Sequence, residues 1–426
     1  MSELEKKLQS EEFEAIKVME DSRKISDELK NEFIDENGAF YQFYLKTKEF
    51  PELVTCFRGN SSPEKIIIYY NNHILWELFR KNCKKETVCC VSISFNHSRY
   101  CESYDKELQS LRKLGFDKDK KRVLKPSWSE EKKGYDGIGY NGSFECIKEK
   151  YSEDFVDETY KIMHKIVDTY FNPNMSEDYF RKYWKLHGDG IVVSPNGKRK
   201  SSYVEKRWQS NLFHYFKNTE NGLFVYDLEF SQPFPNQEFL TKLDKNESEP
   251  KYSQLKAETI KSKIKELINE PDMLAIRYAE NEPVALVLVE VKSTRTACTG
   301  SSSIYKHMKG MYAYSNESVF MEKRIKEARE LMQLYKELGV CGENAKIQIA
   351  DNIPIERLVI LMDNDVPEHE FSEEERKVDV NQSAINYFDN KAVRTKILNE
   401  AKNNECKLGI IRNRYYEEYE MKIINN

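Results

Sequence analysis

The stretch Val284-Ala285-Leu286-Val287-Leu288-Val289-Glu290-Val291-Lys292-Ser293 decides the fold that we expect for this chain. Up to Val289 it is apolar at odd and even positions alike, which predicts a central strand buried on both faces. A carboxylate and an ammonium group follow at the end of this run. Burying a charge is costly unless the charge is paired or binds a metal, so Glu290 and Lys292 are candidate functional residues.

A second apolar run, residues 273–278, precedes this strand, and the polar residues between the two runs are a turn signal. The two runs are therefore predicted to form a β-hairpin. Side chains two residues apart on a strand share a face, so Glu290 and Lys292 point the same way. With a three-residue turn over 280–282, residue 279 pairs with residue 283, and Asp272 lies directly opposite Glu290.

The opposed carboxylates of Asp272 and Glu290 predict a cation site. Their β-carbons would lie about 4.5–5.5 Å apart, and two carboxylates this close repel each other unless a cation lies between them. Such oxygen ligands suit Mg²⁺, which binds one or two carboxylates and keeps several waters. Lys292 could orient or deprotonate a metal-bound water and neutralise charge on a phosphate.

A purely structural interpretation is the alternative. Glu290 and Lys292 would then form a solvated ion pair at the strand end, which contributes little to stability. Asp272, which follows Pro271, would simply begin a turn after the preceding helix.

Pro-Asp, a strand, and Glu-x-Lys at the end of the next strand resemble the motif of the PD-(D/E)XK nuclease superfamily, which has the restriction-endonuclease-like fold. The matching residues are Asp272, Glu290 and Lys292. The resemblance implies that the two acids bind metal and that Lys292 positions the attacking water. It also implies Mg²⁺-dependent hydrolysis of phosphodiester bonds, usually in DNA, with Mn²⁺ able to replace Mg²⁺.

Further residues could complete this site. The Val291 carbonyl is a candidate metal ligand. Many members of the superfamily add an acid from the first core helix, and Glu205 is the candidate by position, although it could instead cap that helix. Asp227 and Glu229 share one face of the strand predicted after that helix. They are a second option for the additional acid.

The helix predicted over 303–314 follows the strand that carries the lysine. Its Lys306, His307 and Lys309 are candidate phosphate contacts. His307 is expected to be a surface residue of this helix rather than a catalytic base, because the metal and Lys292 already supply that chemistry. One exonuclease branch of the superfamily has Gln-x-x-x-Tyr here. This chain has Met308 where that branch has glutamine, four residues before Tyr312, which argues against membership of the branch.

The order of predicted elements defines the fold class. Helix, strand, hairpin, helix and strand follow one another, which is the core order of restriction-endonuclease-like folds. We expect an α/β protein (α+β, with a mixed sheet), with a nuclease-like domain over 196–426 and a separate α/β domain of open role over 1–195. In the N-terminal part, strands are predicted over 66–70 and 88–95, a helix over 74–79 and a loop over 124–142.

Composition sets outer limits on function. The chain has 426 residues, of which 33% are charged and 39% hydrophobic, as is typical of globular proteins with more than one domain. It has no apolar run long enough for a membrane helix and no N-terminal signal region, so we expect a cytoplasmic protein without a membrane partner. A net charge of −5 argues against binding nucleic acid over the whole surface, but it is compatible with a basic cleft.

Two functions follow from these observations. The first is a Mg²⁺-dependent nuclease whose partner is nucleic acid, with DNA the expected substrate and RNA not excluded. A homodimer or a larger complex is compatible with it. The second is a nucleic-acid-binding or protein-binding component on a nuclease-like scaffold that is inactive, or active only within a complex, since a fold does not guarantee an activity.

Overall fold

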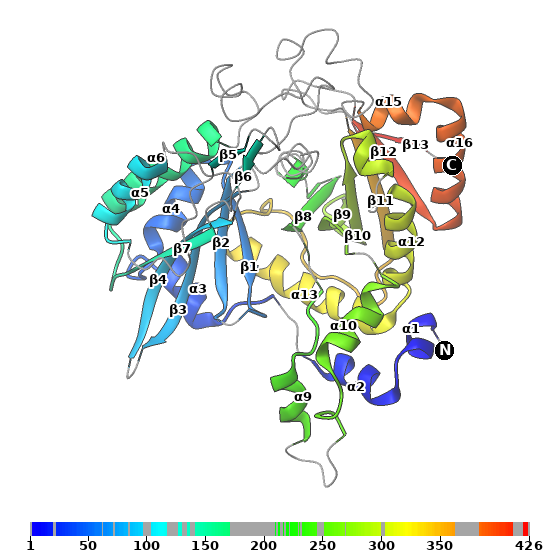
Figure 1. Cartoon of the computed structure of the whole chain (residues 1–426), viewed down its shortest axis with the longest axis horizontal. Coiled ribbons are helices and arrows are strands. Elements are labelled where there is room, and N and C mark those ends of the chain that lie inside the picture. Colours follow the sequence, from blue (N-terminus) through cyan, green and yellow to red (C-terminus); the bar gives the residue numbers. More distant parts are fainter. Residues whose placement is uncertain are drawn as a thin grey trace.

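The computed structural model is a mixed α/β protein with two main sheets (Figure 1). It describes residues 2–424 apart from longer gaps at 97–103, 117–126, 130–133, 137–140, 171–208, 245–250, 363–382 and 412–420, and shorter gaps elsewhere, several of them between 210 and 231. No helix within the described residues is both long enough and apolar enough to cross a membrane.

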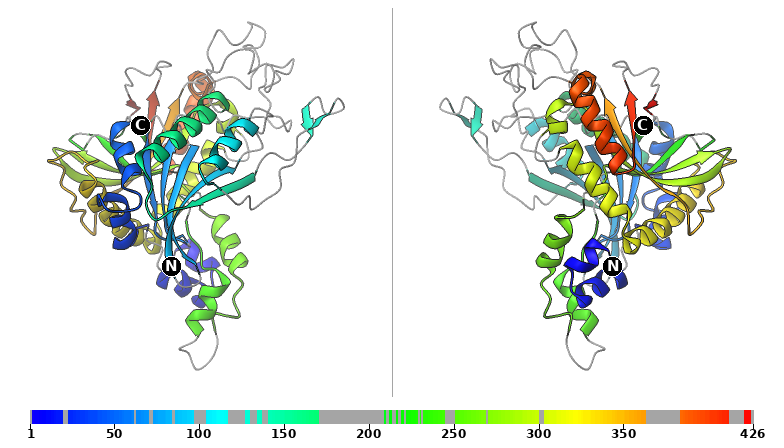
Figure 2. Two further views of the ribbon diagram at one scale, coloured as in Figure 1. Left: turned by 90° about the vertical axis from the view of Figure 1, so that its left-hand side faces the viewer. Right: turned by 90° about the vertical axis from the view of Figure 1, so that its right-hand side faces the viewer.

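The N-terminal sheet is antiparallel, with the order β1-β2-β3-β4-β7. Helices pack on one of its faces, where Trp76 contacts Phe43 with ring centroids 5.0 Å apart (Figure 2). The elements of this half are α3 (Asp27–Ile34), α4 (Tyr41–Glu49), β1 (Val54–Arg58), β2 (Lys65–Tyr70), β3 (His73–Cys83), β4 (Glu86–Asn96), α5 (Tyr104–Lys113), β7 (Asn141–Ile147) and α6 (Glu153–Tyr170).

Two predictions for this half are wrong. Residues 74–79 lie in strand β3 rather than in a helix, and β3 pairs with both β2 and β4. The expected loop over 124–142 contains a small two-stranded sheet of β5 (Ser127–Ser129) and β6 (Gly134–Asp136), and it ends inside β7.

The C-terminal sheet is mixed, with the order β13-β12-β11-β10-β9-β8. Strands β8, β9 and β10 form an antiparallel meander, whereas β10, β11 and β12 run parallel. The elements of this half are β8 (Leu223–Leu228), α9 (Gln237–Leu243), α10 (Ala257–Lys265), β9 (Met273–Ala279), β10 (Glu282–Lys292), α11 (Arg295–Thr299), α12 (Ile304–Ser315), α13 (Ser318–Glu337), β11 (Ile355–Met362), α15 (Ala384–Asp389), α16 (Lys391–Asn403), β12 (Cys406–Ile411) and β13 (Lys422–Ile424).

Strand β10 is buried on both faces, as the sequence predicts. Leu286 and Leu288 point into the core that contains buried residues of α12 and α13, whereas Val287 and Val289 point into a second core shared with β1 and β2. Figure 2 shows α12 and α16 over the C-terminal sheet. Any polar side chain on the even positions of β10 therefore lies beneath a helix.

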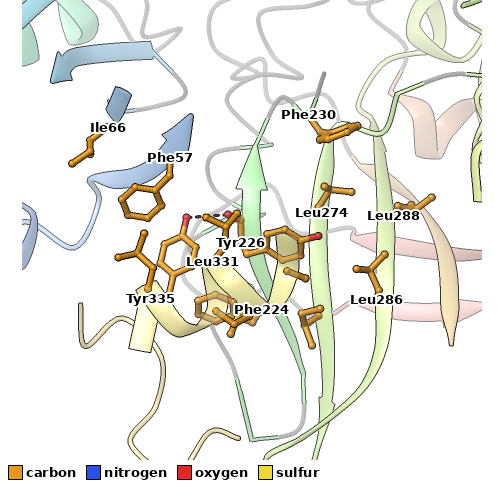
Figure 3. Close-up of a cluster of buried hydrophobic side chains, with 14 of the residues drawn as sticks. Phe57, Ile66, Phe224, Tyr226, Phe230, Leu274, Leu286, Leu288, Leu331 and Tyr335 are labelled. Atoms are coloured by element: carbon orange, nitrogen blue, oxygen red, sulfur yellow. Dashed lines mark hydrogen bonds between the residues drawn. The ribbon is translucent and has the colours of Figure 1, made fainter. Parts of the chain in front are cut away.

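Helix α13 joins the two sheets through Tyr335. The ring of Tyr335 lies between Phe57 of β1 and Phe224 of β8, at centroid distances of 5.4 and 5.7 Å (Figure 3). Its hydroxyl lies 2.9 Å from the carbonyl oxygens of both Thr55 and Tyr226, which share its one hydrogen. One tyrosine thus satisfies main-chain groups of both sheets.

The N-terminal segment packs on the C-terminal half. Helices α1 (Glu3–Lys7) and α2 (Ser10–Val18) lie beside α10 and α13 (Figure 1). Lys7 pairs with Glu266 at 2.7 Å and Lys263 with Glu12 at 2.8 Å. The predicted domain boundary near residue 195 lies outside the described residues, so the division into 1–195 and 196–426 stays a prediction.

The hairpin between β9 and β10 turns more tightly than predicted. Glu282 pairs with Ala279, which leaves a two-residue turn whose residues, Glu280 and Asn281, have φ values of 51° and 63°. An irregularity between Pro283 and Ala285 then shifts the register by one residue, so that Val289 pairs with Met273. Strand β9 begins at Met273, so the pairing of Asp272 with Glu290 stays a prediction. Continued by one residue, the register would produce it through a bulge rather than through a longer turn.

Candidate functional site

Glu290 and Lys292 lie at the carboxyl end of β10, on the face that α12 covers. The Glu290 side chain is 0% exposed and the Lys292 side chain 3% exposed. Nζ of Lys292 donates to Oε1 of Glu290 at 2.5 Å. The two residues therefore form a buried pair, and the alternative interpretation, a solvated ion pair at the strand end, is wrong.

His307 of α12 is a third member of this cluster. Its Nδ1 lies 2.8 Å from the same Glu290 oxygen, and its side chain is 15% exposed. This contact does not meet the geometry of a hydrogen bond, so it is a close approach of the ring nitrogen to the carboxylate. The expectation that His307 is a surface residue is wrong.

Helical periodicity explains why His307 faces the sheet. Ser303 caps α12, its hydroxyl accepting from the amide of Lys306. Ile304, Met308 and Met311 are fully buried, and position 307 belongs to the same stripe, three residues after the first and one before the second. This stripe is the sequence signal that could have identified His307.

The environment of Glu290 favours its ionised form. Burial by itself raises the pKa of this carboxyl, but the Lys292 ammonium and the nearby His307 outweigh burial and hold the pKa below its usual value. Lys292 and His307 both contact Oε1 of Glu290, whereas Oε2 is buried and has no hydrogen-bond partner among the described residues. A buried carboxylate oxygen without a donor is unusual, and a water or an ion is a common partner of such an atom.

Asp272 joins β9 to the end of β10. It is half-buried, and its Oδ2 accepts a hydrogen bond from the amide of Val291 at 2.8 Å. Helix α10 ends at Lys265, several residues before Pro271, so Asp272 does not terminate a helix. Asp272 directly precedes β9, which begins at Met273, so the placement of its side chain opposite Glu290 stays a prediction.

Few side chains that could bind a metal lie at the end of β10 among the described residues. Within the described part of the chain, no three histidine, cysteine, aspartate or glutamate side chains come together as a metal-binding group. Two carboxylates would be enough for Mg²⁺, because this ion usually takes one or two protein carboxylates and completes its shell with water and phosphate oxygens. Asp272 and Oε2 of Glu290 are the donors that would hold it.

Asp227 does not belong to this cluster. It is fully buried and forms ion pairs with Arg23 and with Arg58, the latter at 2.8 Å. The guanidinium carbon of Arg23 also lies 4.8 Å from the centre of the Phe230 ring. The option that Asp227 completes the metal shell is therefore wrong, because Asp227 connects the N-terminal segment and β1 to β8.

The other predicted residues have mixed outcomes. Lys306 and Lys309 are exposed on α12, where nucleic acid could reach them, and their role stays a prediction. Met308 is fully buried, so it takes no part in a polar site. Glu205 and Glu229 lie outside the described residues.

No family model matches this chain, and searches of curated proteins and of solved structures found no match either.

Proposed function

We propose that this protein is a metal-dependent nuclease that hydrolyses phosphodiester bonds, with DNA the expected substrate. The observation that carries the proposal is Glu290, a buried, ionised carboxylate at a strand end that keeps one oxygen without a donor among the described residues. The order of β8, β9, β10, α12, α13 and β11 supports it, because restriction-endonuclease-like folds have this core order.

Each residue of the cluster has a separate role in this proposal. Glu290 and Asp272 hold Mg²⁺, which when bound would offset negative charge on the scissile phosphate. Lys292 keeps Glu290 ionised and adds positive charge beside the phosphate. The hydrogen bond from the Val291 amide keeps Asp272 at the end of β10.

A cleavage assay tests this function. Purified protein is incubated with plasmid, linear DNA, single-stranded DNA and RNA, with Mg²⁺ or with EDTA. We expect cleavage in the presence of Mg²⁺ and no cleavage in EDTA. Lys292→Met, which keeps a side chain of similar volume, is expected to abolish the cleavage. Lys326→Ala, which removes an exposed lysine of α13, serves as the control and is expected to cleave normally. Absence of Mg²⁺-dependent cleavage of all four substrates would contradict the proposal.

One observation favours a second candidate, a binding component that does not cut. Glu290 and Lys292 are almost completely covered, so their contact could serve only to stabilise the end of β10. In that case the wild-type protein binds nucleic acid and cuts none of the four substrates. A gel-shift measurement beside the cleavage assay separates the two functions.

A further inference from the structure

A cavity of about 610 Å³ lies apart from the Asp272–Glu290 cluster, between the segment 232–237 and helix α10. Its volume falls within the range of about 300–1,000 Å³ that is usual for ligand sites. Helices α9 and α10 lie beside each other in this part of the molecule (Figure 1). None of the residues proposed for metal binding lines it.

The charge of this cavity is positive. Lys256, Lys261 and Lys265 line it, and Glu258 is the one acid among its described lining residues. Lys261 and Lys265 are four residues apart on α10 and therefore project from the same face of the helix. Lys265 lies 4.0 Å from Glu270, and both side chains are partly exposed, so this pair leaves the ammonium largely available. The cavity is suited to an anion.

An aromatic ring lies beside these lysines. Phe234 is half-buried and Pro235 is buried, and both line the cavity. The ammonium of Lys265 lies 5.9 Å from the centre of the Phe234 ring. A flat aromatic surface next to a group of cations is the arrangement with which proteins bind single-stranded nucleic acid, the base stacking on the ring and the phosphate pairing with the cations.

The wall of the cavity is hydrogen-bonded to elements of the candidate site. The amide of Gln232 donates to Glu270, two residues before Asp272, at 3.1 Å. The side-chain oxygen of Gln232 accepts from the hydroxyl of Tyr314, at the end of α12, at 2.8 Å. The cavity is thus held to the segment that carries Asp272 and to the helix that carries His307.

We infer that this cavity binds a nucleotide unit of single-stranded nucleic acid, with its phosphate on Lys261 and Lys265 and its base against Phe234. The inference rests on the proposed function in that the bound strand is the substrate. The site lies outside the cutting residues and holds the strand while an adjoining part reaches the Asp272–Glu290 cluster.

Binding of a fluorescently labelled single-stranded DNA in EDTA, where no cleavage occurs, tests the inference. The affinity is measured over a series of salt concentrations for the wild type and for the double variant Lys261→Ala/Lys265→Ala. Each lost phosphate contact lowers the salt slope by about 0.7 for single strands, so a decrease of about 1.4 is expected. The charge-matched control Lys242→Ala/Lys326→Ala removes two exposed lysines outside the cavity and is expected to keep the wild-type slope.

A second variant, Phe234→Ala, tests the stacking contact and is expected to weaken binding about tenfold. The inference is overturned if the wild type does not bind, if the double variant keeps the wild-type slope, if its control loses as much slope, or if Phe234→Ala binds as tightly as the wild type. Failure of this inference can be told apart from failure of the proposed nuclease function. A protein that cuts DNA but shows no cavity-dependent binding refutes only the inference, and a protein that binds through the cavity but never cuts refutes only the nuclease.

Discussion

Nδ1 of His307 lies 2.8 Å from Oε1 of Glu290, which brings a helix residue to the carboxylate at the end of the central strand. Lys292 contacts the same oxygen from its own strand. Glu290 is thereby held from two directions, and its other oxygen keeps a defined orientation. The predictions below start from this arrangement and extend to the charges that join the two halves of the protein.

We predict that His307→Gln lowers cleavage at limiting Mg²⁺ by about 10- to 100-fold, the usual effect of removing a residue that orients a metal ligand. The variant is expected to need more Mg²⁺ for half-maximal activity, because Glu290 is held less firmly. A Mg²⁺ titration of the cleavage rate measures this shift. Lys326→Ala is the control, and an unchanged Mg²⁺ dependence of His307→Gln would show that His307 does not position Glu290.

Glu290→Met and Lys292→Met are each predicted to lower the free energy of unfolding by about 3–5 kcal/mol, because each leaves one buried charge without its partner. The double variant is predicted to lose less than the sum, since two apolar side chains of similar size replace the pair. Urea denaturation in EDTA measures all four proteins. Single variants that lose less than about 1 kcal/mol would mean that the pair behaves as an exposed one.

Asp227→Asn is predicted to lower the free energy of unfolding by about 3–5 kcal/mol, because it removes a buried carboxylate that Arg23 and Arg58 share. The matched control is Asp351→Asn. Asp351 pairs with Arg329 at 2.7 Å, but its side chain is 94% exposed, so a change within about 0.5 kcal/mol is expected. If the two substitutions change the free energy of unfolding equally in urea denaturation, the buried ion pairs of Asp227 do not stabilise the protein more than an exposed pair does.

Glu356 makes the stability depend on pH. Burial raises the pKa of this carboxyl, but hydrogen bonds from Arg277 and Lys407 outweigh burial and lower the pKa below its usual value. A lowered pKa gives stabilisation that is present above the unfolded-state pKa of about 4.3 and is lost as the pH falls through the folded-state value.

Glu356→Gln is therefore predicted to destabilise the protein at neutral pH and to have a smaller effect in acid. Urea midpoints of the wild type and the variant, measured at about pH 7 and about pH 3, give the two differences. A difference that stays constant or grows towards acid would show that Arg277 and Lys407 do not favour the ionised carboxylate.

Local sequence patterns predicted several elements correctly. The strand over 88–95 and the helix over 303–314 appear as β4 and α12, because the first is a short, mostly apolar run and the second has an apolar stripe at helical spacing. The stretch 74–79 was misleading. Leu75 and Trp76 are neighbours and both fully buried, at a point where the pairing of β2 with β3 is irregular, so the alternation typical of a strand is interrupted.

The sequence by itself determined that β10 is a buried strand and that a carboxylate and an ammonium share one face at its end, because both follow from residue type and the two-residue period of a strand. Only the tertiary structure decided that His307 approaches Glu290 and that Asp227 meets Arg23. These partners lie on separate elements, and packing between elements brings them together. A bulge rather than the turn sets the pairing of Val289 with Met273, since an inserted residue reverses the side-chain alternation beyond it.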